Sequence, residues 1–191
     1  VRGLQAEVGE DKRLKWRVLL IQPQKTAGEF QGELEFKLNG LLDPEIIQAL
    51  YRASQDGVRI DLNVRGLCAL RPGVKGLSDN IKVNSIVGRF LEHARIYYFR
   101  NGGEEEVLLG SSDMMSRNLK RRVEVLFPVL DEGYRRKLID EILPIHLKDN
   151  AKSRDMLPDG TYVKRRMAKG EAKVDSQDWL IRNRGSWHRE E

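Results

Sequence analysis

The sequence has little cysteine, little histidine and no long apolar run. Its 191 residues include one cysteine, Cys68, which excludes an internal disulfide and a cysteine-based zinc site. No apolar stretch approaches the ~20 residues that a membrane-spanning helix needs. The first residues carry charges where a signal peptide needs an apolar segment. We therefore expect a soluble, intracellular domain.

Charge, by contrast, is plentiful. The chain has 34 Lys and Arg against 29 Asp and Glu, a net charge of +5, and 40% of its residues are hydrophobic. This balance is typical of a globular protein rather than a disordered one. Three basic triplets begin at Lys120, Arg135 and Lys164. They could attract an anionic partner, although solvated helix faces are the commoner explanation for any one of them.

Hydrophobic patterning predicts strands that alternate with helices. We expect strands over residues 17–23, 33–39, 58–66, 94–99, 106–110 and 123–130. We expect helices from Asp43-Pro44 to near Gly57, over 85–93 and over 134–147. This order predicts an α/β fold with a mixed sheet flanked by helices on both faces.

The same patterning divides the chain into three parts. Residues 1–16 are polar, and we expect them to be poorly ordered; residues 17–155 form the domain. The periodicity fades after about Ala151, so residues 156–191 are expected to be a basic polar tail.

His93 is the histidine best placed for chemistry. It stands where a predicted helix gives way to a strand, and Arg95 shares its face if both residues are extended. An imidazole beside a guanidinium can hold phosphate oxygens, pass a proton or bond to phosphorus. The alternative, a packed and hydrogen-bonded histidine, is the commoner case. The other histidines are His146, near a helix end, and His188, in the tail.

Arg65 and the loop over residues 71–80 are further candidates for anion binding. Arg65 ends a predicted strand just before a glycine, at the edge where open α/β sheets bind ligands. Its planar donors suit phosphate, although a surface ion pair explains it equally well. The loop has glycines that let backbone N–H groups converge on an anion. It lacks the Walker order, so its signal is weak.

A small polar group follows the strand predicted over 106–110. It consists of Ser111, Ser112, Asp113 and Asn118, with Arg117, Arg121 and Arg122 nearby. Helix capping explains the serines and Asp113 equally well. Arg122 and Glu124 have the same parity, which allows an ion pair. No His, Asp and Glu cluster has the spacing of a metal site, and no Ser-His-Asp or Cys-His nucleophile context is present.

Taken together, these segments resemble the C-terminal domain of polyphosphate kinase over residues 33–166. The similar stretches are KLNGLLDPEIIQALYRASQDGV, IDLNVRGLCALRPGVKGLSDNI, SIVGRFLEHARIYYFRNGG, GSSDMMSRNLKRRVEVLFPV and DNAKSRDMLPDGTYVKRR. Enzymes of that family move the terminal phosphate of ATP onto inorganic polyphosphate, reversibly. The resemblance implies a phospholipase D-like fold. Its His-x-Lys signature would be His93-Ala94-Arg95, completed by Ser111 and Asn118.

The resemblance also implies roles for single residues. Arg65, His93 and Arg95 would bind ATP or its phosphates, and Arg122 with Arg117 would line the polyphosphate channel. His93 would be catalytic, by proton transfer or phosphate contact. The histidine that accepts the phosphate lies in the family's preceding domain, outside this chain. Mg²⁺ would come with ATP, bound mainly by other parts of the enzyme.

As partners, the resemblance implies ATP or ADP, inorganic polyphosphate and the preceding domains of a homo-oligomeric enzyme, with no nucleic acid and no transmembrane segment. It implies a cytoplasmic location, with a peripheral position at the inner membrane as an alternative. Two other functions stay open: a non-catalytic polyanion-binding module, and a phospholipase D-like phosphodiesterase that acts as a dimer. The sequence departs from the family at QKTAGEFQG, which is too short for the usual helix before KLN.

Overall fold

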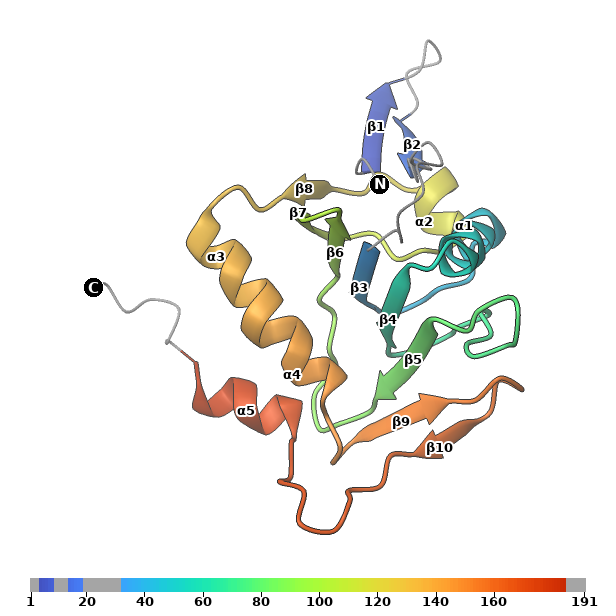
Figure 1. Ribbon diagram of the computed structural model, residues 1–191. Helices are drawn as coiled ribbons and strands as arrows, with labels where there is room; N and C mark the ends of the chain where they lie inside the picture. Colours follow the sequence, from blue (N-terminus) through green and yellow to red (C-terminus); the bar gives the residue numbers. More distant parts are fainter. Residues whose placement is uncertain (1–3, 9–13, 19–31, 185–191) are drawn as a thin grey trace.

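One mixed sheet of eight strands forms the centre of the protein (Figure 1). The computed structural model describes residues 4–8, 14–18 and 32–184. The strand order in the sheet is β10-β9-β5-β4-β3-β6-β7-β8. Its three central strands run parallel to one another, and the strands on both sides of them are antiparallel. This mixed arrangement confirms the predicted sheet.

The central strands are β3 (Gly32–Leu38), β4 (Arg59–Val64) and β5 (Ile81–Ile86). On one side follow β6 (Ile96–Asn101), β7 (Glu104–Gly110) and β8 (Leu126–Pro128), and on the other β9 (Ser153–Met156) and β10 (Tyr162–Lys164). A separate antiparallel pair consists of β1 (Leu4–Val8) and β2 (Leu14–Val18).

The helix α1 (Pro44–Gln55) covers one face of the sheet. Asp43 caps it, since its carboxylate accepts the backbone N–H groups of Glu45 and Ile46 at 3.1 and 3.3 Å. Every second residue of β3, from Leu34 to Leu38, packs into the same buried core as Leu50 of the helix. The local signals of strand, cap and helix therefore predict this half of the fold correctly.

A second set of helices covers the opposite face. It is one continuous run of α3 (Glu132–Lys137), a π-helical turn η1 (Leu138–Ile142) and α4 (Leu143–Leu147), joined by α5 (Ser176–Arg182). Tyr98 of β6 packs here with Leu143, whereas its neighbour Tyr97 belongs to the core on the α1 side. The α/β fold with helices on both faces is confirmed (Figure 1). Among the described residues, no helix combines the length and apolar character needed to span a membrane.

The helix predicted over 85–93 is wrong. Residues Ile81–Ile86 form β5, which pairs with β4 and β9, and residues 87–95 have no regular secondary structure. The four-residue spacing of Ile86 and Phe90 imitates a helical face, but the ladders to the neighbouring strands satisfy the β5 backbone instead. The strand predicted over 123–130 is shorter in the structure, where it spans only Leu126–Pro128.

The structure also corrects the expected polar tail, because ordered structure continues beyond residue 155. The chain adds β10 to the sheet and then forms α5. The buried Asp149 anchors this region, since it accepts N–H groups from residues 151–153 and both the N–H and the hydroxyl of Ser176. Such side-chain bonds leave no hydrophobic period for sequence analysis to detect.

Within the N-terminal part, the described residues Leu4–Val8 and Leu14–Val18 form β1 and β2, and the expected poor order of residues 1–16 stays a prediction. The rest of the strand predicted over 17–23, and the short connection where the family has a helix, lie in residues 19–31, outside the described residues.

Candidate functional site

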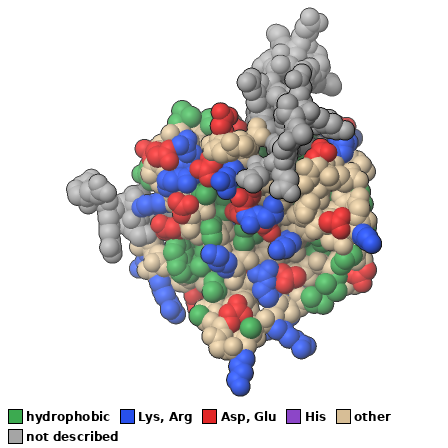
Figure 2. Space-filling model, viewed as in Figure 1, with side chains coloured by type: hydrophobic (Ala, Val, Ile, Leu, Met, Phe, Trp, Pro, Cys, Tyr) green, Lys and Arg blue, Asp and Glu red, His purple; other side chains and the backbone are tan. Residues whose placement is uncertain are grey.

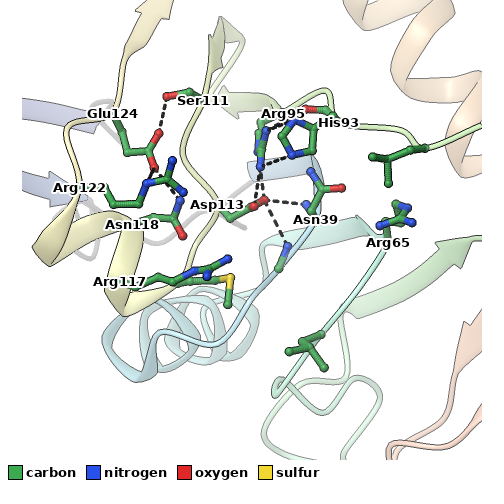
Figure 3. A pocket seen from close by; sticks show the side chains of 14 residues that line it. Asn39, Arg65, His93, Arg95, Ser111, Asp113, Arg117, Asn118, Arg122 and Glu124 are labelled. Atoms are coloured by element: carbon green, nitrogen blue, oxygen red, sulfur yellow. Dashed lines mark hydrogen bonds and ion pairs between the residues drawn. The ribbon is translucent and has the colours of Figure 1, made fainter.

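A cavity of about 480 Å³ opens where the parallel strands β3 and β4 end (Figure 3). Its lining brings together the seven residues to which the family resemblance assigns a place in the site: Arg65, His93, Arg95, Ser111, Arg117, Asn118 and Arg122. These residues come from the ends of β4 and β7, from the segment before β6 and from the short helix α2 (Ser116–Arg121) with the residue that follows it. The carboxyl edge of parallel strands is where open α/β sheets bind ligands.

Arg65 follows β4 directly and is held by its backbone. Its N–H donates to Leu38 O at 3.1 Å, and its carbonyl accepts the hydroxyl of Ser85 at 3.0 Å. The next residue must be glycine, because a Cβ on Gly66 would lie 2.7 Å from Asn39 O. The Arg65 side chain lines the cavity and forms no ion pair with any carboxylate in the described part of the chain. Its guanidinium is therefore available to an anion.

Arg95 is buried and fully engaged. Its Nε and Nη2 donate to the two oxygens of Asp113 at 3.2 and 2.7 Å, a bidentate ion pair. Its Nη1 donates to the backbone oxygen of His93 at 2.9 Å. Nη1 and Nη2 also lie 3.1 and 3.2 Å from the two ring nitrogens of His93 (Figure 3). Arg95 thus fixes the imidazole of His93, which is itself exposed to solvent.

Asp113 is the residue that orders this corner of the site. Besides the pair with Arg95, it accepts the backbone N–H of Asn39 at 2.7 Å and that of Gly40 at 3.2 Å. Burial opposes its charge, but these hydrogen bonds and the Arg95 charge lower the pKa of Asp113 below its usual value. Asp113 therefore stays ionised and ties β3, β6 and the loop after β7 together. The alternative of a helix cap is wrong for this residue.

A second carboxylate, Glu124, organises the opposite side of the cavity. It accepts the hydroxyl of Ser111 and the amide Nδ2 of Asn118, the latter at 2.6 Å, and lies 3.5 Å from Arg122 Nε. Burial opposes its charge, yet these donors lower the pKa of Glu124. Ser111 and Asn118 are thereby supporting residues that fix a buried carboxylate, and the ion pair expected between Arg122 and Glu124 is present.

The charge that remains in the cavity is positive. Four arginines line it against two carboxylates, and both carboxylates are already bound by the neighbours described above. Arg117, at the start of α2, like Arg65, pairs with no carboxylate among residues that the structure describes. Two exposed apolar side chains, Leu67 and Leu91, complete the rim. Such a cavity suits an elongated anion with several negative groups.

Two other features of the sequence lie elsewhere. The glycine-bearing loop over 71–80 binds itself: Gly73 N–H donates to Ser78 O at 2.9 Å, and Gly76 N–H donates to the Asp79 carboxylate at 2.6 Å. The basic triplets are largely paired with carboxylates, as in Lys120 with Glu45 at 3.0 Å and Arg165 with Asp155. On the face shown in Figure 2, basic and acidic side chains are interspersed. The structure thus does not support anion binding by the loop over 71–80. The three basic triplets fit the explanation of solvated surface residues.

Sequence reasoning missed Asn39 and the roles of Asp113 and Glu124. Arg95 and Asp113 are 18 residues apart, and Asn39 and Asp113 are 74 apart, so no local spacing reveals either contact. The parity of Arg122 and Glu124 is the one signal that points to a contact here.

Comparisons with known proteins agree on one family. The family model described as polyphosphate kinase C-terminal domain 2 matches residues 18–177. The polyphosphate kinase of Synechocystis sp. is 55% identical over 146 residues, which are 76% of this chain and 20% of that protein. The one from Rhodopirellula baltica is 51% identical over 150 residues, 78% of this chain and 18% of that protein.

A solved structure shows the same fold. The crystal structure of polyphosphate kinase from Porphyromonas gingivalis matches with a TM-score of 0.78 and 42% identity, over 84% of this chain and 24% of that one. The chain thus spans about a fifth of the length of the curated relatives described above. Because the family model covers most of its residues, the chain belongs to the family of polyphosphate kinase C-terminal domain 2.

Proposed function

We propose that this chain is the part of an ATP:polyphosphate phosphotransferase that contacts nucleotide and polyphosphate. The enzyme would transfer the terminal phosphate of ATP to inorganic polyphosphate, reversibly. The observation that carries the proposal is the cavity itself, in which four arginines and His93 face two carboxylates that are already bound. Its relatives carry the name polyphosphate kinase, which supports the same activity for this chain's enzyme.

Arg65 and His93 would hold the phosphates of ATP. Arg65 is fixed by its backbone and has no competing carboxylate in the described region, so its fork of donors can meet phosphate oxygens. His93 is exposed, and Arg95 holds its ring. Phosphoryl transfer depends mainly on such positioning and charge compensation. Arg95 itself as a phosphate ligand stays a prediction, because its donors are committed to Asp113 and His93 in this structure.

Arg117 and Arg122 would guide the polyphosphate chain. Both lie at α2, across the cavity from Arg65 (Figure 3). The Arg122 side chain is 60% exposed, and only its Nε approaches Glu124, so the outer nitrogens can reach a phosphate. A polymer of phosphate could then pass between the α2 side and the nucleotide side of the same cavity.

The chemistry breaks the bond between the terminal phosphorus of ATP and the bridging oxygen, which leaves with ADP. By family resemblance, a histidine in the preceding domain, outside this chain, accepts the phosphoryl group and passes it to the terminal oxygen of polyphosphate. His93 would donate or accept a proton, or contact the phosphate, during that exchange. The described residues contain no group of three or more His, Cys, Asp or Glu that could hold a metal ion. We propose that Mg²⁺ enters with ATP and is held mainly by other parts of the enzyme.

The family also guides the proposals on context. The full-length enzyme would be a cytoplasmic homo-oligomer in which the preceding domains complete the site. The alternative of a phospholipase D-like phosphodiesterase is disfavoured by one observation. The residue in the place of the usual lysine, Arg95, is buried against Asp113 and leaves no free cation at that position.

Substitution of His93 in the full-length enzyme tests the proposal. His93→Ala should reduce synthesis of polyphosphate from ATP to a small residual rate, while the far-UV circular dichroism and the thermal midpoint stay unchanged because the ring is exposed. Arg59→Ala, an exposed arginine at the opposite end of β4, is the control and should keep full turnover. Unchanged turnover in His93→Ala would contradict the catalytic role. Polyphosphate binding without any turnover in the unmodified enzyme would favour the polyanion-binding module, and diesterase activity that disappears in His93→Ala would favour the phosphodiesterase.

A further inference from the structure

His93 lies in a segment that no helix or strand stabilises. Residues 87–95 are irregular, and the His93 ring is exposed on the cavity side. A side chain on such a segment keeps one place only if other contacts fix the backbone. Those contacts come from the face of the sheet opposite to α1, from two groups that the proposed chemistry does not use.

The first group is Gln177 in α5. Its Oε1 accepts the N–H of Phe90 at 3.0 Å, and its Nε2 donates to the carbonyl of Phe90 at 2.9 Å. The same Nε2 donates to the Glu92 carboxylate at 2.9 Å. Gln177 is buried, and it pairs with the backbone of Phe90 as a neighbouring strand would. The fit is tight, since a Cβ on Gly88 would lie 2.4 Å from Gln177 Oε1.

The second group is a buried cluster around Glu92, the residue next to His93. The Glu92 carboxylate lies 2.5 Å from Lys37 Nζ in β3 and 3.0 Å from His146 Nε2 in α4. Burial opposes its charge, but the contacts with His146 and Lys37 outweigh burial and lower the pKa of Glu92 to about 2. Glu92 is thus ionised and fastened from two elements at once.

The anchor extends to the C-terminal region. Asp149 accepts the N–H and the hydroxyl of Ser176, each at 2.8 Å, which fixes the first turn of α5. Gln177 is the next residue. The hydrogen bonds of its side chain all end on the segment that leads to His93, namely on Phe90 and Glu92.

We propose that Gln177, together with Glu92, is a positioning residue that sets the place of the His93 imidazole. The inference rests on the proposed function, because it assigns these groups a part in that reaction. Neither side chain lines the cavity, so each acts through the backbone that carries His93. Loss of the Gln177 contacts lets residues 88–92 shift. A shift of about 1 Å at a reacting group can lower turnover by roughly a hundredfold.

The test is a double-mutant cycle in the full-length enzyme. Gln177→Leu keeps the side-chain volume and removes all three hydrogen bonds. We expect its kcat to fall roughly tenfold to a hundredfold and KM for ATP to change much less, because Arg65 still holds the nucleotide. In the background of His93→Ala, the same change should lower any residual turnover no further. Arg182→Gln, an exposed position of the same helix, should keep full turnover.

Gly88→Ala reaches the same contact from the other side. The added methyl group meets Gln177 Oε1 without deleting a buried group, so this variant serves if Gln177→Leu fails to fold. It should show the same fall in kcat. Gly133→Ala, where the new methyl lies 3.3 Å from one oxygen of Asp131, is the matched glycine control and should be active.

The outcomes separate this inference from the proposed function. Hydrogen exchange of the Phe90 amide should be slow in the unmodified protein and fast in Gln177→Leu, whatever the activity. If His93→Ala is fully active, the proposed function fails. If His93→Ala is inactive but Gln177→Leu and Gly88→Ala keep full kcat, or if their losses are equal in both backgrounds, Gln177 is a structural residue only and the inference is overturned.

Discussion

Two clusters with the same kinds of side chain lie on either side of one peptide unit and have opposite characters. On the cavity side, His93 meets Arg95 and Asp113, and the imidazole is open to solvent. On the other side, Glu92 meets Lys37 and His146, whose side chains are each only 3% exposed. The histidine of the first cluster is available to a ligand, whereas that of the second is enclosed by protein.

The difference shows that burial and charge balance, rather than residue type, separate a site from a structural cluster. In the enclosed cluster the Lys37 ammonium already meets the Glu92 carboxylate, so the cluster gains nothing from an outside ion. The open cluster lies next to Arg65 and Arg117, which meet no carboxylate among the described residues. An anion that enters the cavity meets uncompensated positive charge there. Loss of a group should therefore lower stability in the enclosed cluster and ligand binding in the open one.

The largest effect should come from Lys37→Met. The change leaves the Glu92 carboxylate, whose side chain is 11% exposed, without its closest cation, and breaking a buried ion pair costs about 3–5 kcal/mol. Urea unfolding of the chain at pH 7 measures it. Lys120→Met removes an exposed lysine paired with Glu45 and should lower the free energy of unfolding far less, because solvent screens an exposed pair. Equal losses in both variants would remove the distinction between enclosed and exposed pairs.

Arg65→Ala should weaken ATP binding with little effect on stability. Loss of a charged hydrogen bond to phosphate lowers binding free energy by ~1.5–3 kcal/mol. Calorimetry on a fragment that contains this chain and the preceding domain gives the affinity. Arg59→Ala, at the start of β4 and paired with Glu35 and Asp61, is the matched control and should bind ATP normally. An unchanged affinity in Arg65→Ala would contradict its assignment.

A smaller effect is expected in the salt dependence of polyphosphate binding. Binding of a polyanion releases its counterions, so affinity falls as salt rises. Arg117→Ala removes one phosphate contact and should reduce the slope of log Kd against log salt by roughly one unit. Arg154→Ala, an exposed arginine on β9 outside the cavity lining, should leave the slope unchanged. Equal slopes in all three proteins would exclude Arg117 from the path of the polymer.

The sequence predicts best what short-range signals encode. The strand β3 and the helix α1 follow from alternation and from the cap at Asp43, and both form where expected. The helix prediction for residues 85–93 is wrong because β5 forms through its pairing with β4 and β9. Local sequence patterning does not encode that pairing. Sequence analysis misses the C-terminal helix α5 for a related reason, since Asp149 fixes that helix through hydrogen bonds across 27 residues.

For the site, sequence analysis finds the residues that could meet an anion but not those that hold them. Arg65 and His93 are predicted, and they do line one cavity. Asp113 and Gln177 act through partners that are distant in the sequence. Asp113 binds Arg95, 18 residues away, and Gln177 binds Phe90, 87 residues away. Such contacts exist only once the sheet has formed, so neither periodicity nor spacing can reveal them.

A titration that follows the histidine ring nitrogens by NMR tests the central claim most directly. Tripolyphosphate is added to the chain, with each histidine assigned by a single substitution. We predict a saturable shift of the His93 ring signals, because that ring lines the positive cavity, while those of the enclosed His146 stay in place. Unmoved His93 signals, or equal shifts of both histidines, would contradict the assignment of this cavity as the phosphate site.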